Sequence, residues 1–119
     1  MFMEGLAFEF KPKVKKTNVD LNKRAERAKI RFGDDYDFIV SDEFLKSTPW
    51  RQVRYDVLRR DGARCRCCGR TPSEGIYVCV DHISPRKTNP ELALNPKNLQ
   101  VLCNECNHGK GNEDETSWR

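Results

Sequence analysis

The sequence predicts a small α+β domain that needs more than an apolar core to hold it together. It has 119 residues, of which 37% are hydrophobic and 34% are charged, so the apolar core must be small. Helical spacing of apolar residues is found in the first half, and a strand-like alternation followed by a brief apolar segment is found in the second. All six cysteines lie in the second half, and they are the candidates for stabilising the fold in addition to the small apolar core.

Length and hydropathy exclude several classes of protein. The length fits one domain with a tail and excludes a multi-domain enzyme. No run approaches the roughly 18 apolar residues of a membrane helix, and Met1–Phe10 lacks the basic-then-apolar order of a signal peptide. We therefore expect a soluble, cytoplasmic protein with no membrane association.

The charges are unevenly distributed. Residues 1–33 hold nine basic and four acidic residues, residues 34–46 hold one and five, and residues 47–75 hold seven and three. Two basic stretches separated by an acidic one are typical of a protein with a polyanionic partner. Solvated faces of an ordinary small protein would look the same, so charge alone does not decide the function.

The first half predicts two helices. Asn18 or Asp20 can cap a basic helix that runs to about Phe32 and stops at Gly33. Residues 34–46 mix acids with apolar side chains and are predicted to form a short strand or turn.

The second helix is predicted to start at Ser47-Thr48-Pro49, where a hydroxyl cap precedes a proline. Its core face is expected to consist of the apolar side chains at helical spacing, namely Trp50, Val53, Val57 and Leu58. Asp61 and Gly62 end it. The arginines on its other faces are open to a binding role.

The second half predicts a strand, a loop and a final helix. A turn at Thr71–Gly75 precedes the period-two alternation of a half-buried strand that ends near Ile83. A polar loop with three prolines covers Ser84–Lys97, and such long loops are usually functional or disordered. After the apolar segment Leu99–Leu102, a short helix is expected from about Cys103 to Gly111.

Two cysteine pairs predict a metal site. Cys65 and Cys68 form one CxxC pair, and Cys103 and Cys106 form another. Two such turns can complete a tetrahedral four-sulfur shell around Zn²⁺, which would be structural because no position stays open for water. Disulfides are the rival interpretation, but a chain without an export signal more often uses such thiols for metal.

Two cysteines fall outside this pattern. Cys67 could replace Cys68 as a ligand in a CxC turn. Cys79, on the expected strand, is most simply a small buried side chain.

A second group of polar residues surrounds the end of the predicted strand. Asp81 offers the hard oxygen ligand that Mg²⁺ or Mn²⁺ prefers, and the neutral imidazole of His82 can take a proton from water. Neighbouring strand residues face opposite ways, so both can serve one site only if the strand bends or ends there.

These motifs, in this order, resemble those of the HNH endonucleases. The resemblance rests on Cys65–Cys68, Asp81-His82-Ile83, Asn98-Leu99, Leu102-Cys103 and Cys106-Asn107-x-x-Lys110. It covers about Trp50 to Gly111 and leaves residues 1–46 uninterpreted. It implies a ββα-metal fold, in which a hairpin and a helix surround one catalytic ion and a four-cysteine zinc clamps the unit from behind.

The resemblance also implies roles for individual residues. His82 corresponds to the general base, Asp81 to a ligand of the catalytic Mg²⁺ or Mn²⁺, and Asn98 to the asparagine that ties the loop. The last motif position is often histidine and is Asn107 here, whose side-chain oxygen can still bind a hard ion. His108 is an alternative ligand, but a rotation of about 100° along a helix separates it from Asn107.

We therefore expect a DNA endonuclease that acts on double-stranded DNA, with residues 1–46 as a basic arm and acidic linker, 47–112 as the nuclease domain and 113–119 as a tail. The expected phosphate contacts are Arg51, Arg54, Arg86, Lys87 and Lys110. A non-catalytic zinc-ribbon-like module that binds nucleic acid or protein is the alternative. It explains the cysteine pairs equally well but leaves Asp81, His82 and Asn98 as coincidence.

Overall fold

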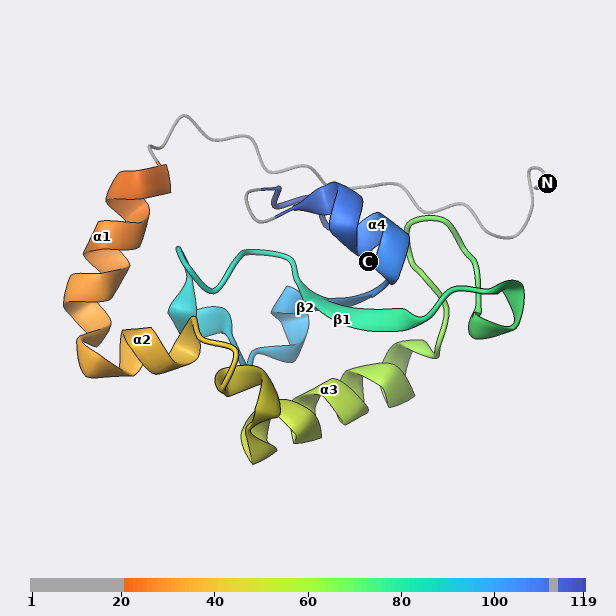
Figure 1. Ribbon diagram of the computed structural model, residues 1–119, viewed down its shortest axis with the longest axis horizontal. Coiled ribbons are helices and arrows are strands. Elements are labelled where there is room, and N and C mark those ends of the chain that lie inside the picture. Colours follow the sequence, from red (N-terminus) through yellow and green to blue (C-terminus); the bar gives the residue numbers. More distant parts are fainter. Residues whose placement is uncertain (1–20, 112–113) are drawn as a thin grey trace.

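A computed structural model describes residues 21–111 and 114–119 (Figure 1). Helices α1 (Leu21–Phe32) and α2 (Asp34–Ile39) precede α3 (Thr48–Asp61). The chain then forms an antiparallel pair, β1 (Val78–His82) and β2 (Leu99–Cys103), followed by helix α4 (Asn104–Lys110). This order confirms the predicted α+β class, and β1, β2 and α4 form the expected ββα unit.

Helix α1 ends at Phe32, as predicted, because Gly33 adopts a positive φ of 56° that other residues avoid. Its predicted start at Asn18 or Asp20 lies outside the described residues.

The strand expected over residues 34–46 does not form: α2 replaces it over Asp34–Ile39, and only residues 40–46 form turns, the last of them a 3-10 turn at Phe44–Lys46. Three aspartates in the first turn of α2 favour a helix there, since negative charge stabilises a helix N-terminus. Tyr36 anchors α2 from its buried position, and its hydroxyl donates to the carbonyl oxygen of Lys87 at 2.7 Å.

Helix α3 begins at Thr48 with Ser47 in the N-cap position, as predicted. The Ser47 hydroxyl does not cap the helix, because it donates to the carbonyl oxygen of Phe44 in the preceding turn at 2.6 Å. The predicted core face is confirmed: Trp50 and Val57 are buried, and Val53 and Leu58 pack against the same cluster.

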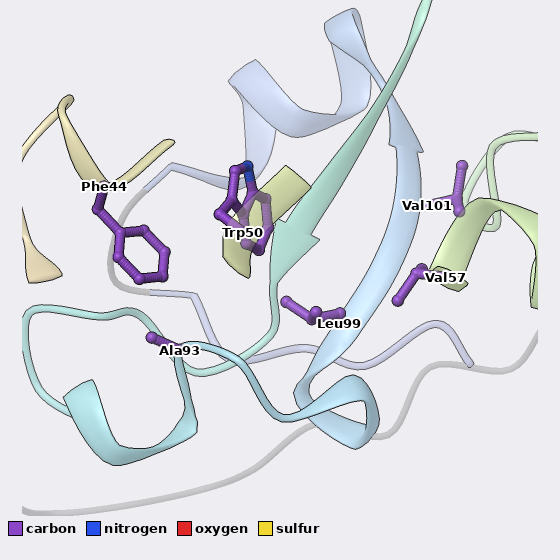
Figure 2. Close-up of a cluster of buried hydrophobic side chains, with 6 residues drawn as sticks. All are labelled: Phe44, Trp50, Val57, Ala93, Leu99 and Val101. Atoms are coloured by element: carbon purple, nitrogen blue, oxygen red, sulfur yellow. The ribbon is translucent and has the colours of Figure 1, made fainter. Parts of the chain in front are cut away.

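The main core lies between α3 and the strand pair. Helix α3 lies on one side of the two strands and α4 on the other (Figure 1). Figure 2 shows the buried side chains of this core, which are Phe44, Trp50, Val57, Ala93, Leu99 and Val101. Strand β1 is half-buried, as predicted, whereas every residue of β2 is buried. The loop between the strands contains two 3-10 turns, Pro90–Leu92 and Pro96–Asn98.

Candidate metal centre and active site

Four cysteine side chains converge where the two predicted turns meet. The Sγ atoms of Cys65, Cys68, Cys103 and Cys106 all lie within 4.8 Å of one another. Those of Cys68 and Cys103 are 3.8 Å apart, which equals the edge of about 3.8 Å of a tetrahedron with Zn–S bonds of about 2.3 Å. Cys67 is outside this group, so the sulfurs cluster as two CxxC pairs.

Donors surround these sulfurs. The backbone N–H groups of Cys68 and Cys106 each point at the sulfur of the first cysteine of their pair, at 3.4 Å. The guanidinium of Arg70 donates to the Cys68 sulfur at 3.3 Å and to the Glu105 carboxylate at 2.8 Å. Such donors favour thiolates, which are the form that binds metal.

The surroundings of the thiols shift their pKa values in different directions. Burial raises the pKa of the Cys65 and Cys106 thiols. Burial acts in the same direction at Cys68, but the hydrogen bonds from Arg70, Cys65 and Cys103 together outweigh it and bring the pKa down to about 7. A soft divalent cation would offset the cost of four crowded thiolates, so the donor set fits Zn²⁺.

His82 is the last residue of β1, and its ring packs against α3. The ring stacks on Trp50 with centroids 4.8 Å apart and an interplanar angle of 22°. Its Nε2 lies 2.9 Å from the carbonyl oxygen of Ala93. A carbonyl oxygen only accepts, so Nε2 carries the hydrogen and Nδ1 keeps a lone pair. Burial lowers the pKa of His82 to about 4, so the ring is neutral near pH 7.

Asp81 contacts a different set of partners. Its Oδ2 accepts a hydrogen bond from Gln100 Nε2 at 2.9 Å and lies 3.5 Å from Lys110 Nζ. Burial raises the pKa of Asp81, and Lys110 and Gln100 oppose that rise. Lys110 Nζ also lies 3.3 Å from the carbonyl oxygen of His82, where β1 ends. Strand β1 thus ends at His82, with Asp81 in contact with β2 and α4 and His82 in contact with α3 and the loop between the strands.

Asn98 joins the two ends of the loop between the strands. Its side chain accepts from the Ser84 backbone N–H at 2.9 Å and donates to the carbonyl oxygens of Ser84 and Leu92 at 3.1 and 3.3 Å. Its own carbonyl accepts from the Ile83 N–H at 2.8 Å. These bonds hold the loop segment that presents the Ala93 carbonyl to His82.

Asn107 and His108 occupy different environments on α4. Burial raises the pKa of the Cys79 thiol, and the Asn107 side chain lies close enough to it to oppose that rise. Cys79 is half-buried, less than the buried side chain expected, and lies two residues before Asp81, so both share a face of β1. His108 is exposed. Of these two residues, Asn107 is the one directed at the strand.

The five predicted phosphate contacts divide into two groups. Arg51 and Lys87 are exposed and Arg54 is half-exposed. Arg86 instead donates to the carbonyl oxygens of Ile39 and Ser41 at 2.7 and 3.0 Å. The Lys110 side chain is only 5% exposed. Arg86 and Lys110 therefore tie elements of the fold together.

Two residues that contact the candidate site are not among those predicted from the sequence. Gln100 touches Asp81, and its signal was a polar residue inside an otherwise apolar segment. Arg70 touches the cysteine cluster, and its signal was a basic residue just after a CxxC pair.

A ββα unit with four gathered thiols and an Asp-His pair at the end of its first strand is the arrangement expected of a small nuclease fold with a candidate metal site. The HNH endonuclease family model matches residues 65–113. The chain is 32% identical over 81 residues to a probable HNH endonuclease of Lactococcus phage SK1. The aligned region makes up 65% of this chain and 84% of that protein. This chain belongs to the HNH endonuclease family.

Two further proteins are similar to it. The Septu protein PtuB of Bacillus thuringiensis is 31% identical over 80 residues, which cover 63% of this chain. The matched region spans only 31% of that relative. The HNH endonuclease of the deep-sea thermophilic bacteriophage GVE2, whose crystal structure was solved with a manganese ion, is 27% identical and has a TM-score of 0.47. That match covers 81% of this chain and 90% of the phage protein's chain.

Membership of this family indicates a nuclease, because HNH endonucleases act on nucleic acids. Among the described residues, no helix has the length and apolar character needed to cross a membrane.

Proposed function

We propose that this protein is a metal-dependent DNA endonuclease that hydrolyses phosphodiester bonds with His82 as general base. The observation that carries the proposal is the Nε2 contact of His82 with the Ala93 carbonyl, because it leaves Nδ1 as a free proton acceptor on a neutral ring. Stacking on Trp50 fixes the plane of that ring. Nδ1 takes a proton from the water that attacks phosphorus, and cleavage leaves 5′-phosphate and 3′-hydroxyl ends.

Asp81 and Asn107 are the proposed protein ligands of a catalytic Mg²⁺ or Mn²⁺. The described contacts of Asp81 fall on Oδ2, so the proposal assigns Oδ1 to the ion. A carboxylate and an amide oxygen suit a hard ion that takes its other ligands from water and phosphate. When bound, the ion supplies electrostatic stabilisation of the phosphorane-like charge and of the leaving 3′ oxygen.

Asn98 is the proposed positioning residue for His82. It touches neither substrate nor ion in this scheme. Its hydrogen bonds to Ser84 and Leu92 hold the loop, and through the loop the carbonyl that orients the histidine ring.

The four-cysteine cluster is proposed to hold a structural Zn²⁺ that joins the turn at Cys65–Cys68 to the start of α4. Four thiolates fill a tetrahedral shell, so this ion would have no place for a catalytic water.

Double-stranded DNA is the proposed substrate. Of the predicted phosphate contacts, Arg51, Arg54 and Lys87 have side chains available at the surface. Their contacts would neutralise phosphates without reading bases and would weaken with salt. We propose residues 47–112 as the nuclease domain, with 1–46 as an arm and linker and 113–119 as a tail that packs back on the domain through Trp118.

The test is cleavage of supercoiled plasmid with Mg²⁺ or Mn²⁺. We expect His82→Ala to lower the rate by about 10²–10⁴-fold. His108→Ala is the matched control and should retain the rate, because that histidine is exposed on α4. Nicking that survives His82→Ala would reject the assigned base. DNA binding without cleavage under any divalent ion would favour the zinc-ribbon-like binding module.

A further inference from the structure

One buried polar side chain has no part in the scheme above. Gln100 is 0% exposed, although it lies at the centre of a strand whose other members are apolar or cysteine. In the register of the strand pair it stands directly opposite Asp81. A buried amide without partners would cost about 1–3 kcal/mol, so its hydrogen bonds explain why it is tolerated.

Both ends of the Gln100 amide are engaged. Nε2 donates to Asp81 Oδ2 at 2.9 Å and to the carbonyl oxygen of Thr116 at 3.2 Å. Oε1 accepts from the backbone N–H of Trp118 at 2.7 Å. The amide therefore connects the proposed ion ligand to the C-terminal segment 114–119.

The Trp118 contact determines which way the amide faces. A backbone N–H needs an acceptor, so Oε1 must point toward Trp118 and Nε2 toward Asp81. Without that N–H, the amide could rotate and present its oxygen to the Asp81 carboxylate, which would repel it. The carbonyl of Thr116 favours the same orientation, because it needs a donor.

The C-terminal segment is itself anchored away from the site. Trp118 packs against the cluster around Cys65 and Leu102, and Arg119 Nη1 donates to the carbonyl oxygen of Lys97 at 3.1 Å. These contacts fix the backbone that orients Gln100.

We propose that Gln100 is a positioning residue for Asp81 and that segment 114–119 keeps it in place, so that the end of the chain is part of the support for the ion site. This inference rests on the proposed function, in which Asp81 binds the catalytic ion. Residues that hydrogen-bond to a metal ligand typically change metal affinity about 10–100-fold when they are altered.

The experiment measures Mn²⁺ binding by electron paramagnetic resonance on zinc-loaded protein with duplex DNA. A His82→Ala background keeps the DNA uncleaved and serves as the reference. Adding Gln100→Met, which keeps the volume and removes the amide, should weaken Mn²⁺ binding about tenfold or more. A chain that ends at Asp114 should weaken Mn²⁺ binding by a comparable factor. The two changes together should weaken Mn²⁺ binding little more than either change alone.

Thr116→Ala is the matched control. Segment 114–119 reaches Gln100 through main-chain atoms, so this substitution leaves both contacts in place and should leave Mn²⁺ affinity unchanged. Thermal unfolding of each variant checks that it folds. If Gln100→Met destabilises the domain, the truncated chain still tests the same link.

The outcomes separate the inference from the proposed function. Unchanged Mn²⁺ affinity in folded Gln100→Met or in the truncated chain, with normal binding by the reference, would overturn the inference alone. Cleavage by the reference would count against His82 as the base. Lack of Mn²⁺ binding by the reference would overturn the ion site and the inference with it.

Discussion

The cysteine cluster and the Asp81–His82 region are built in different ways. Each half of the cluster is a local turn, in which a backbone N–H points at the sulfur three residues earlier. His82 and Asp81 instead depend on partners far along the chain, from Trp50 on α3 to Gln100 on β2. Each half of the cysteine cluster is thus encoded locally, while the candidate active site is encoded by tertiary packing.

Removing Cys103, a proposed zinc ligand, should have the largest effect. Cys103→Ser leaves three thiols around the proposed ion, and metal binding contributes free energy directly to folding in such domains. We expect loss of bound zinc and of the cooperative unfolding transition, measured by elemental analysis and circular dichroism. Cys79→Ser is the control, because Cys79 lies outside the cluster. A Cys103→Ser protein with full zinc content and wild-type stability would contradict the local scaffold described above.

Truncating Trp50 should destabilise the Asp81–His82 region. Trp50 is 5% exposed and packs against both Phe44 and the His82 ring, which also contact each other. Trp50→Ala should cost about 3–5 kcal/mol of unfolding free energy, measured by urea denaturation of the zinc-loaded protein. Trp50→Phe keeps an aromatic ring beside His82 and should cost less. Equal losses in the two variants would show that the ring contact contributes little.

Removing the Asn98 side chain tests the loop without touching either core. Asn98 is buried and makes three side-chain hydrogen bonds, so Asn98→Ala should cost about 1–3 kcal/mol and slow plasmid cleavage. Asn95→Ala is the matched control in the same loop, because Asn95 is exposed and makes one local bond to the Lys97 N–H at 2.9 Å. Identical behaviour of the two variants would remove Asn98 from its positioning role.

The same contrast explains what the sequence could predict. The CxxC spacing and the period-two strand are local patterns, and both appear in the structure. The acidic composition of residues 34–46 predicts a linker, whereas three of these aspartates are favourable charges at the start of helix α2. The contact of His82 with the Ala93 carbonyl had no signal, since any residue offers a carbonyl and only the folded loop brings it there. The sequence predicts a tail at 113–119 and has no signal for the link of segment 114–119 to Gln100, because that link uses main-chain atoms.

The smallest effect is expected where α1 meets the loop. Arg31 Nη2 lies 3.0 Å from Glu91 Oε1, with the side chains 62% and 45% exposed. An exposed ion pair contributes about 0–1 kcal/mol, because water and salt screen it and two long side chains lose freedom. Glu91→Gln should therefore change the unfolding free energy by less than about 1 kcal/mol and should become indistinguishable from wild type at high salt. A double-mutant cycle with Arg31→Gln isolates the pair. A coupling energy well above about 1 kcal/mol that persists at high salt would contradict this expectation. It would mean that the contact between α1 and the loop contributes to the stability of the domain.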